Sequence, residues 1–132
     1  MRQLFRLAVT HGSGGRAEVD GYLVGGKTGT ANKVNLHKKG YDSSRVLSSF
    51  AGVFPMSQPQ YLVVVLLDEP KGVNSVRGQN TGGWVAAPVV GKVIRRIGPM
   101  KAIVPMLDPA LDPSVAATLV EVDGDEVRLA AY

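Results

Sequence analysis

The chain contains no cysteine, and this absence excludes disulfide bonds and thiolate metal sites. Long hydrophobic runs are also missing. The longest purely aliphatic stretch, residues 62–67, has six residues, whereas a membrane-spanning helix needs about 20. Met1 is followed by an amphipathic stretch and not by an apolar signal core, so we expect no targeting segment here. The 132 residues amount to about one domain.

Aromatic residues are sparse, at 6% of the chain, and this bears on a basic segment. Residues 27–45 contain five basic residues against a single acid, Asp42, and only Tyr41 lies near them as an aromatic. Nucleic-acid binding usually interleaves cations with aromatic stacking platforms, so we expect no nucleic-acid partner. The segment is either a solvated surface or a positively charged approach for an anionic substrate. No metal-ligand pattern is visible, and we expect no metal or cofactor.

Hydrophobic periodicity predicts the first elements. Apolar residues at i, i+4 spacing predict a helix over residues 2–10. Aromatic and branched residues predict strands over residues 22–30, 45–54 and 60–68, with a polar loop at 32–44. The connection "PMSQP" is short, so the second and third strands form a hairpin. The unbroken apolar run of the third strand predicts burial on both of its faces.

A second helix is predicted over residues 84–98, after a loop rich in Gly, Asn and Pro at 69–83. Pro88 suits the first helical turn, where a missing N–H leaves no bond unmade. Gly98-Pro99 is expected to end the helix. The predicted buried stripe consists of Val85, Val89, Val93 and Ile97, with Ile94 beside them.

These elements predict an α+β fold, with an antiparallel sheet packed against N- and C-terminal helices over residues 1–98. Residues 99–132 look different, because "PMLDPALDP" predicts an irregular segment. "TLVEVDGDEVRLAAY" predicts a β-hairpin extension with its turn at Gly124-Asp125.

The stretch "GYLVGGKTGTANK", residues 21–33, fits two motifs. The first motif is a phosphate-binding loop, G-x-x-x-x-G-K-[ST], whose fixed positions are matched by Gly21, Gly26, Lys27 and Thr28. The apolar strand that ends in "DE" at residues 68–69 would supply its magnesium-binding acid. However, a phosphate loop must follow a strand and open a helix. The residues before Gly21 form a poor strand, and those after Thr28 a poor helix start.

The alternative motif is K-T-G-T on a strand, for which the local propensity is good. Lys27 and Gly29 then lie on one face, and Thr28 and Thr30 on the other. Glycine at position 29 would let another element approach the lysine closely.

With "GYLVGGKTGTANK", three further segments carry a family resemblance: "GYDSSRVLSSFAGVFP", "QYLVVVLLDEP" and "TGGWVAAPVVGKVI". From residue 2 to about residue 97, the chain resembles the C-terminal part of the transpeptidase domain of class B, cell-division-type penicillin-binding proteins. The resemblance implies that Lys27 supplies positive charge and helps proton transfer. It implies that Thr28 and Thr30 hold the terminal carboxylate of the substrate, with Gly29 between them on the binding strand. The Thr30 N–H would form half of an oxyanion hole.

Two motifs of that family, S-x-x-K and S-x-N, do not occur in this sequence. The resemblance therefore implies a fragment of a peptidoglycan D,D-transpeptidase that lacks the serine nucleophile and is inactive alone. Its expected partners are a stem peptide ending in D-Ala-D-Ala or a β-lactam, the missing N-terminal part of the domain, and a second copy through an uncovered sheet. The expected location is the periplasmic side of the inner membrane. The alternatives are a phosphate-loop nucleotide hydrolase and a non-catalytic binding module with the same sheet.

Overall fold

The computed structural model describes residues 1–35, 38–71 and 79–106. Helix α1 (Arg2–Thr10) and a short 3-10 turn, η1 (Gly15–Ala17), precede the sheet. Three strands follow: β1 (Gly25–Val34), β2 (Tyr41–Phe54) and β3 (Tyr61–Asp68). Helices α2 (Gly82–Val85) and α3 (Ala87–Met100) complete the fold. The predicted α+β architecture is confirmed, and the predicted first helix has the observed bounds.

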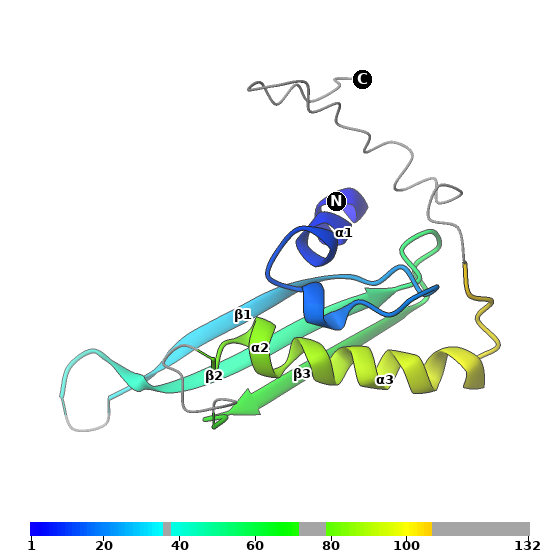
Figure 1. Ribbon diagram of the computed structural model, residues 1–132. Coiled ribbons are helices and arrows are strands. Elements are labelled where there is room, and N and C mark those ends of the chain that lie inside the picture. Colours follow the sequence, from blue (N-terminus) through cyan, green and yellow to red (C-terminus); the bar gives the residue numbers. More distant parts are fainter. Residues whose placement is uncertain (36–37, 72–78, 107–132) are drawn as a thin grey trace, which may run out of the picture.

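The three strands form one antiparallel sheet in the order β1-β2-β3. The short link from Phe54 to Tyr61 joins β2 and β3 as the predicted hairpin. Helix α3 runs along one face of the sheet, and α1 lies beside β1 (Figure 1). Residues paired across the strands share a face. Thr28, Phe50 and Val65 therefore lie on the α3 side, whereas Lys27, Ala51 and Val64 lie on the opposite side.

The core lies between α3 and the sheet, and Phe50 is at its centre. Phe50, Phe54, Val90 and Ile94 are fully buried. Glycines let the neighbouring segments approach the Phe50 ring. A Cβ added to Gly14, Gly26 or Gly52 would lie 2.9, 2.7 or 3.2 Å from an atom of that ring, respectively. The ring of Phe50 thus packs closely against three positions that carry no side chain.

The predicted first strand was placed too early. Leu23 has a φ of 44°, which breaks the extended conformation, and β1 begins two residues later at Gly25. It also continues four residues past the predicted end, to Val34, while β2 begins at Tyr41. The predicted loop at 32–44 is therefore partly strand. Its polar residues pair across the hairpin after a register shift that follows Asn32.

The prediction that β3 is buried on both faces was wrong. Its residues alternate between half-buried and exposed. Leu62, Val64 and Leu66 are 64%, 52% and 59% exposed, because α3 covers only the other face among the described residues. A continuous apolar run fixes neither face, since both faces of a strand receive every second residue.

The C-terminal helix differs from the prediction in its bounds and in its buried face. Ala86 separates α2 from α3, and α3 continues through Gly98-Pro99 to Met100. Pro99 lies one residue before the end of the helix, and the Lys101 N–H bonds carbonyls of the last turn. The buried residues of α3 are Ala87, Val90, Gly91, Ile94 and Gly98. Of the predicted stripe, Val85 and Ile94 are buried, Val93 and Ile97 are half-buried, and Val89 alone is exposed. The helix face that bears Gly91 packs against η1, since a Cβ added at Gly91 would lie 3.3 Å from the carbonyl oxygens of Arg16 and Ala17. Val89 lies on a different face of the helix and is exposed.

Three predictions fall wholly or mostly outside the described residues: the irregular segment "PMLDPALDP" beyond residue 106, the hairpin with its turn at Gly124-Asp125, and the central part of the loop at 69–83. Within the residues that are described, no helix combines the length and apolarity needed to cross a membrane. The same part of the chain has no group of three or more His, Cys, Asp or Glu residues placed to hold a metal.

Candidate active site

Lys27, Thr28, Gly29 and Thr30 lie together on β1, as the sequence predicted. β1 is at the edge of the sheet, and no strand among the described residues pairs with its outer side. An edge strand can accept an extended peptide by main-chain pairing. The motif therefore stands where a ligand backbone could reach it.

The structure rules out the phosphate-loop interpretation. Residues 27–30 are strand and are followed by further strand, so no helix begins at Thr28. Backbone N–H groups at a helix N-terminus would have to face the phosphates. Without that helix, the Gly21, Gly26, Lys27 and Thr28 spacing has no phosphate-binding geometry.

Lys27 and Gly29 lie on the face opposite α3. Lys27 is exposed, and its Nζ donates to the backbone oxygen of Thr28 over 2.9 Å. Gly29 pairs with Ser49 of β2, and a Cβ at position 29 would lie 2.5 Å from Ser49 Oγ. The absence of a side chain at Gly29 thus leaves space for a hydroxyl of the neighbouring strand, and sequence reasoning did not identify that hydroxyl.

The hydroxyls of Thr28 and Thr30 lie on the α3 side, and each has a partner from another element. Thr28 Oγ1 lies 2.8 Å from Ser13 Oγ, in the loop after α1. Thr30 Oγ1 accepts a hydrogen bond from the Gly82 N–H at the start of α2, at 3.0 Å. The motif is therefore held from two sides by segments far from it in the sequence.

Ser13 and Gly82 were missed by the sequence analysis, although both lie in glycine-rich stretches, "HGSGG" and "TGG". A Cβ at Gly82 would lie 2.2 Å from the Ser49 carbonyl oxygen and 2.6 Å from that of Gly29. Glycine is therefore required for α2 to reach the strands. The clustering of glycines was the available signal, since glycine permits close backbone approach.

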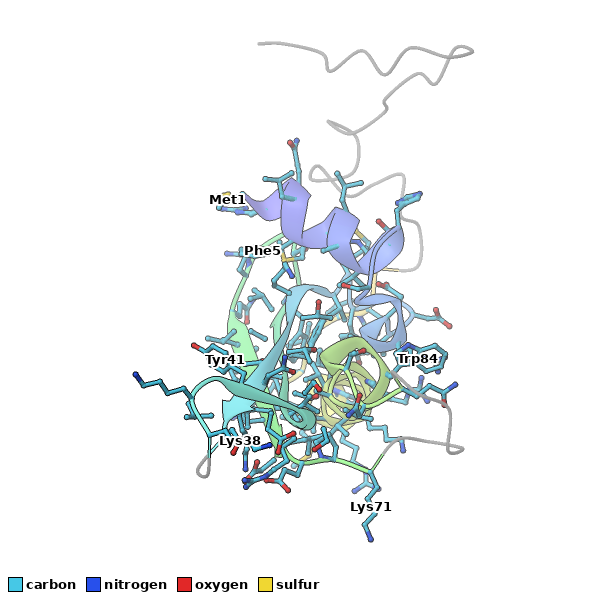
Figure 2. All side chains as sticks on the ribbon, turned by 90° about the vertical axis from the view of Figure 1, so that its left-hand side faces the viewer. Met1, Phe5, Lys38, Tyr41, Lys71 and Trp84 are labelled. Atoms are coloured by element: carbon cyan, nitrogen blue, oxygen red, sulfur yellow. The ribbon has the colours of Figure 1, made fainter. Side chains whose placement is uncertain are left out.

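A pocket of about 380 Å³ adjoins this side of the motif, between the loop after α1 and the start of α2. Ser13, Arg16 and Trp84 are among the residues that line it. The Arg16 guanidinium stacks 3.9 Å from the centre of the Trp84 ring. Figure 2 shows Trp84 on the outer side of the helical layer.

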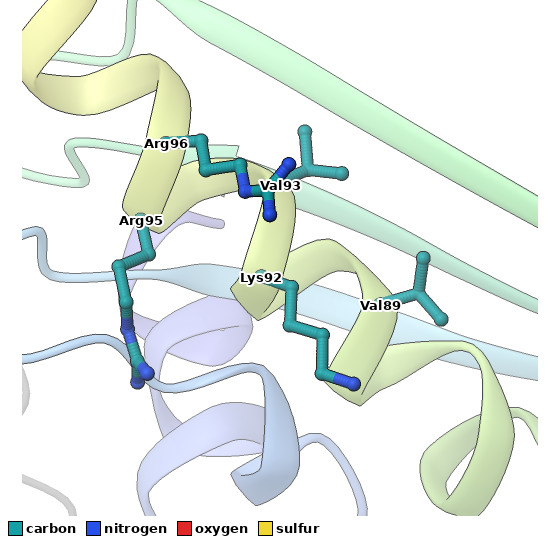
Figure 3. Close-up of a pocket in the computed structure, with 5 residues that line it drawn as sticks. All are labelled: Val89, Lys92, Val93, Arg95 and Arg96. Atoms are coloured by element: carbon teal, nitrogen blue, oxygen red, sulfur yellow. The ribbon is translucent and has the colours of Figure 1, made fainter.

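A second pocket, also about 380 Å³, lies on α3 and is lined by Val89, Lys92, Val93, Arg95 and Arg96 (Figure 3). Its three cations have no ion pair with any carboxylate in the described part of the chain. Among the described residues, only those of α3 line this pocket, and β1 contributes none of them.

Part of the basic segment is neutralised at the far end of the β1–β2 hairpin. Lys33 Nζ forms ion pairs with Asp68 and with Glu69, the latter at 2.8 Å, and Arg45 binds Glu69 at 2.7 Å. The hydrogen bonds from Lys33 and then Arg45 lower the pKa of Glu69. Those to Asp68 and Glu69 raise the pKa of Lys33. Both cations therefore tie β3 to the hairpin, and only the other basic residues of the segment are available to attract an anion.

The chain matches the family model described as the penicillin-binding protein transpeptidase domain over residues 1–95. It is 50% identical over 96 residues to the probable peptidoglycan D,D-transpeptidase FtsI of Caulobacter vibrioides, covering 70% of this chain and 16% of that protein. It is 42% identical over 95 residues to the stage V sporulation protein D of Bacillus subtilis, covering 72% of this chain and 14% of the relative. A crystal structure of penicillin-binding protein 3 from Mycobacterium tuberculosis, complexed with ampicillin, superposes with a TM-score of 0.70 at 27% identity, covering 84% of this chain and 25% of that one.

The chain thus spans roughly one sixth of the length of these curated relatives. The agreement in sequence covers the K-T-G-T strand and the elements that support it. This chain belongs to the penicillin-binding protein transpeptidase domain family and carries one part of that domain.

Proposed function

We propose that the chain is the C-terminal part of a cell-division-type peptidoglycan D,D-transpeptidase, and that its β1 edge binds the D-Ala-D-Ala end of a stem peptide or a β-lactam. The observation that carries the proposal is the placement of Lys27, Thr28 and Thr30 on an edge strand. The ligand backbone extends β1, and its terminal carboxylate accepts hydrogen bonds from the two threonine hydroxyls. Lys27 contributes a positive charge beside them.

In this proposal, the nucleophile comes from a longer parent protein that contains the chain. The parent's S-x-x-K serine attacks the peptide carbonyl, and the Thr30 N–H stabilises the oxyanion together with the N–H of that serine. One such donor is typically worth about 10²–10³ in rate. The chain alone has no S-x-x-K or S-x-N motif, so it is inactive by itself.

The rest of the transpeptidase domain is the proposed cover for the sheet face opposite α3. This face bears Leu62, Val64 and Leu66, which are all more than half exposed, and Lys27 lies on the same face. An apolar strip of this kind favours burial against another surface. In the isolated chain, a second copy takes that place, through this face or the free sheet edge. Light scattering should show concentration-dependent dimers, which Val64→Lys abolishes if they form through this face and leaves unchanged if they form through the edge; a strict monomer at high concentration would contradict this self-association.

The proposed location is the periplasmic side of the inner membrane, with the anchor in the parent. Peptidoglycan lies outside that membrane, so the substrate is available only there. A fusion of a periplasm-dependent reporter to the parent tests the location, and an expressed fusion whose reporter stays inactive would refute it.

The function is tested by labelling the parent with a fluorescent penicillin. The unmodified parent should form a covalent adduct, and Lys27→Ala should abolish it because the lysine that assists acylation is gone. Lys92→Ala is a matched control, because Lys92 is an exposed lysine of α3 in a pocket to which no described residue of β1 contributes. Normal labelling of Lys27→Ala would refute the assigned role.

The reading frame decides between this function and the remaining alternative. An S-x-x-K motif upstream of residue 1 supports the transpeptidase. A frame without one supports a non-catalytic binding module, in which the same strand binds a stem peptide reversibly.

A further inference from the structure

The Thr28 hydroxyl has one close side-chain neighbour that the proposed function does not use. Ser13 Oγ lies 2.8 Å away, a normal distance for two hydroxyls that share a hydrogen bond. Lys27 Nζ is farther, at 3.5 Å from Thr28 Oγ1, and it makes its shorter bond to the Thr28 backbone oxygen. Ser13 is therefore the strongest candidate among the described residues for setting the orientation of the Thr28 hydroxyl.

The direction of that bond determines what Thr28 can offer a ligand. A hydroxyl has a single hydrogen to donate and can accept two bonds. A carboxylate only accepts, so Thr28 can bind one only with its own hydrogen. That hydrogen is free only when Ser13 donates to Thr28.

Thr30 has the same arrangement with a donor whose direction is fixed. The Gly82 N–H can only donate, and it does so to Thr30 Oγ1. The Thr30 hydrogen is therefore left for another acceptor. We infer that Ser13 is a positioning residue that donates to Thr28 and thereby directs the Thr28 hydrogen, in parallel with that of Thr30, toward the carboxylate of the ligand; this inference rests on the proposed function.

The loop that carries Ser13 is held on both sides, as a positioning role requires. The Gly14 N–H bonds the Ala8 carbonyl of α1 at 2.8 Å. On the other side, a Cβ at Gly83 would lie 2.3 Å from the Ser13 carbonyl oxygen, so the start of α2 packs directly on this residue. Gly14 itself lies against Phe50 of the core. The Ser13 side chain is thus presented to Thr28 from a fixed backbone, although it is exposed to solvent.

The test measures the second-order rate constant of penicillin acylation in the parent. Ser13→Ala should lower it about three- to tenfold, the range for one net hydrogen bond. Ser13→Thr should restore the rate, because the hydroxyl returns. Ser44→Ala is the matched control, since the Ser44 hydroxyl bonds only Asp42 in the described residues. The melting temperature of Ser13→Ala should match that of the unmodified parent, because Ser13 is exposed.

A double-mutant cycle identifies the route of the effect. In a Thr28→Val background, Ser13→Ala should have no further effect, because Ser13 acts through the Thr28 hydroxyl. An equal loss in both backgrounds, or no loss in either, would overturn the inference. The same measurements separate this inference from the proposed function. If the unmodified parent is not acylated, the proposed function and the role of Ser13 are both refuted. If the parent is acylated and Ser13→Ala leaves the rate unchanged, only the role of Ser13 is refuted.

Discussion

Of the glycine-to-alanine substitutions near the site, Gly82→Ala should cause the largest loss of folding stability. Its Cβ would lie 2.2 Å from the Ser49 carbonyl oxygen and 2.6 Å from that of Gly29, about 1 Å inside the 3.4 Å at which ordinary contact begins. Both oxygens belong to the backbone of paired strands, so neither can rotate away. The start of α2 must therefore move outward, and the Gly82 N–H leaves Thr30.

The expected loss of stability lies at the upper end of the range for overpacking, about 3 kcal/mol. For a chain of this length, that loss lowers Tm by roughly 9–18 °C. Thermal unfolding of the full chain followed by circular dichroism, at one fixed protein concentration, measures it. Gly15→Ala is the control, because its Cβ would lie no closer than 3.4 Å to any neighbour. If Gly82→Ala and Gly15→Ala both have the Tm of the wild type, then α2 does not approach the strands as closely as the structure places it.

Two further predictions concern the core and the ion pairs. Phe50→Ala should cost about 3–5 kcal/mol in urea unfolding, because the ring is fully buried; Phe5→Ala, at a 36% exposed position, should cost much less. Hydrogen bonds from Lys33 and Arg45 lower the pKa of Glu69 from its ordinary value of 4.5, so the stability that Glu69 contributes is complete above that value and is lost as pH falls through the lowered pKa. The urea midpoint of the wild type should therefore exceed that of Glu69→Gln near neutral pH, and the two should converge as pH falls below the lowered pKa of Glu69; a gap that persists in strong acid would contradict the assignment.

Local sequence patterns were sufficient where one periodicity dominated. The i, i+4 spacing gave α1 its correct bounds, and the turn "PMSQP" gave the β2–β3 hairpin. The strand position of Lys27 also followed from local propensity. In each case, the deciding interactions lie within a few residues of the pattern.

Features that depend on tertiary packing were not predictable. Nothing local marks Leu23 for a positive φ, which arises where the chain turns into β1. The buried face of α3 is set by the approach of η1 to Gly91, so a stripe centred on Val89 was an equally good pattern in sequence. Ser13 and Gly82 reach β1 only because the fold joins segments 15 and 52 residues apart from their threonine partners.

The glycines around Phe50 limit what an engineered variant of this domain can accept. A side chain at Gly26, one residue before the site lysine, would meet both the Phe50 ring, at 2.7 Å, and the Ala51 carbonyl oxygen, at 2.4 Å. A smaller residue at position 50 removes only the first of these contacts, because the carbonyl belongs to the paired backbone of β2. An alignment of relatives should therefore show glycine at position 26 whether or not position 50 is aromatic, and Gly26→Ala should remain destabilising in a Phe50→Leu background.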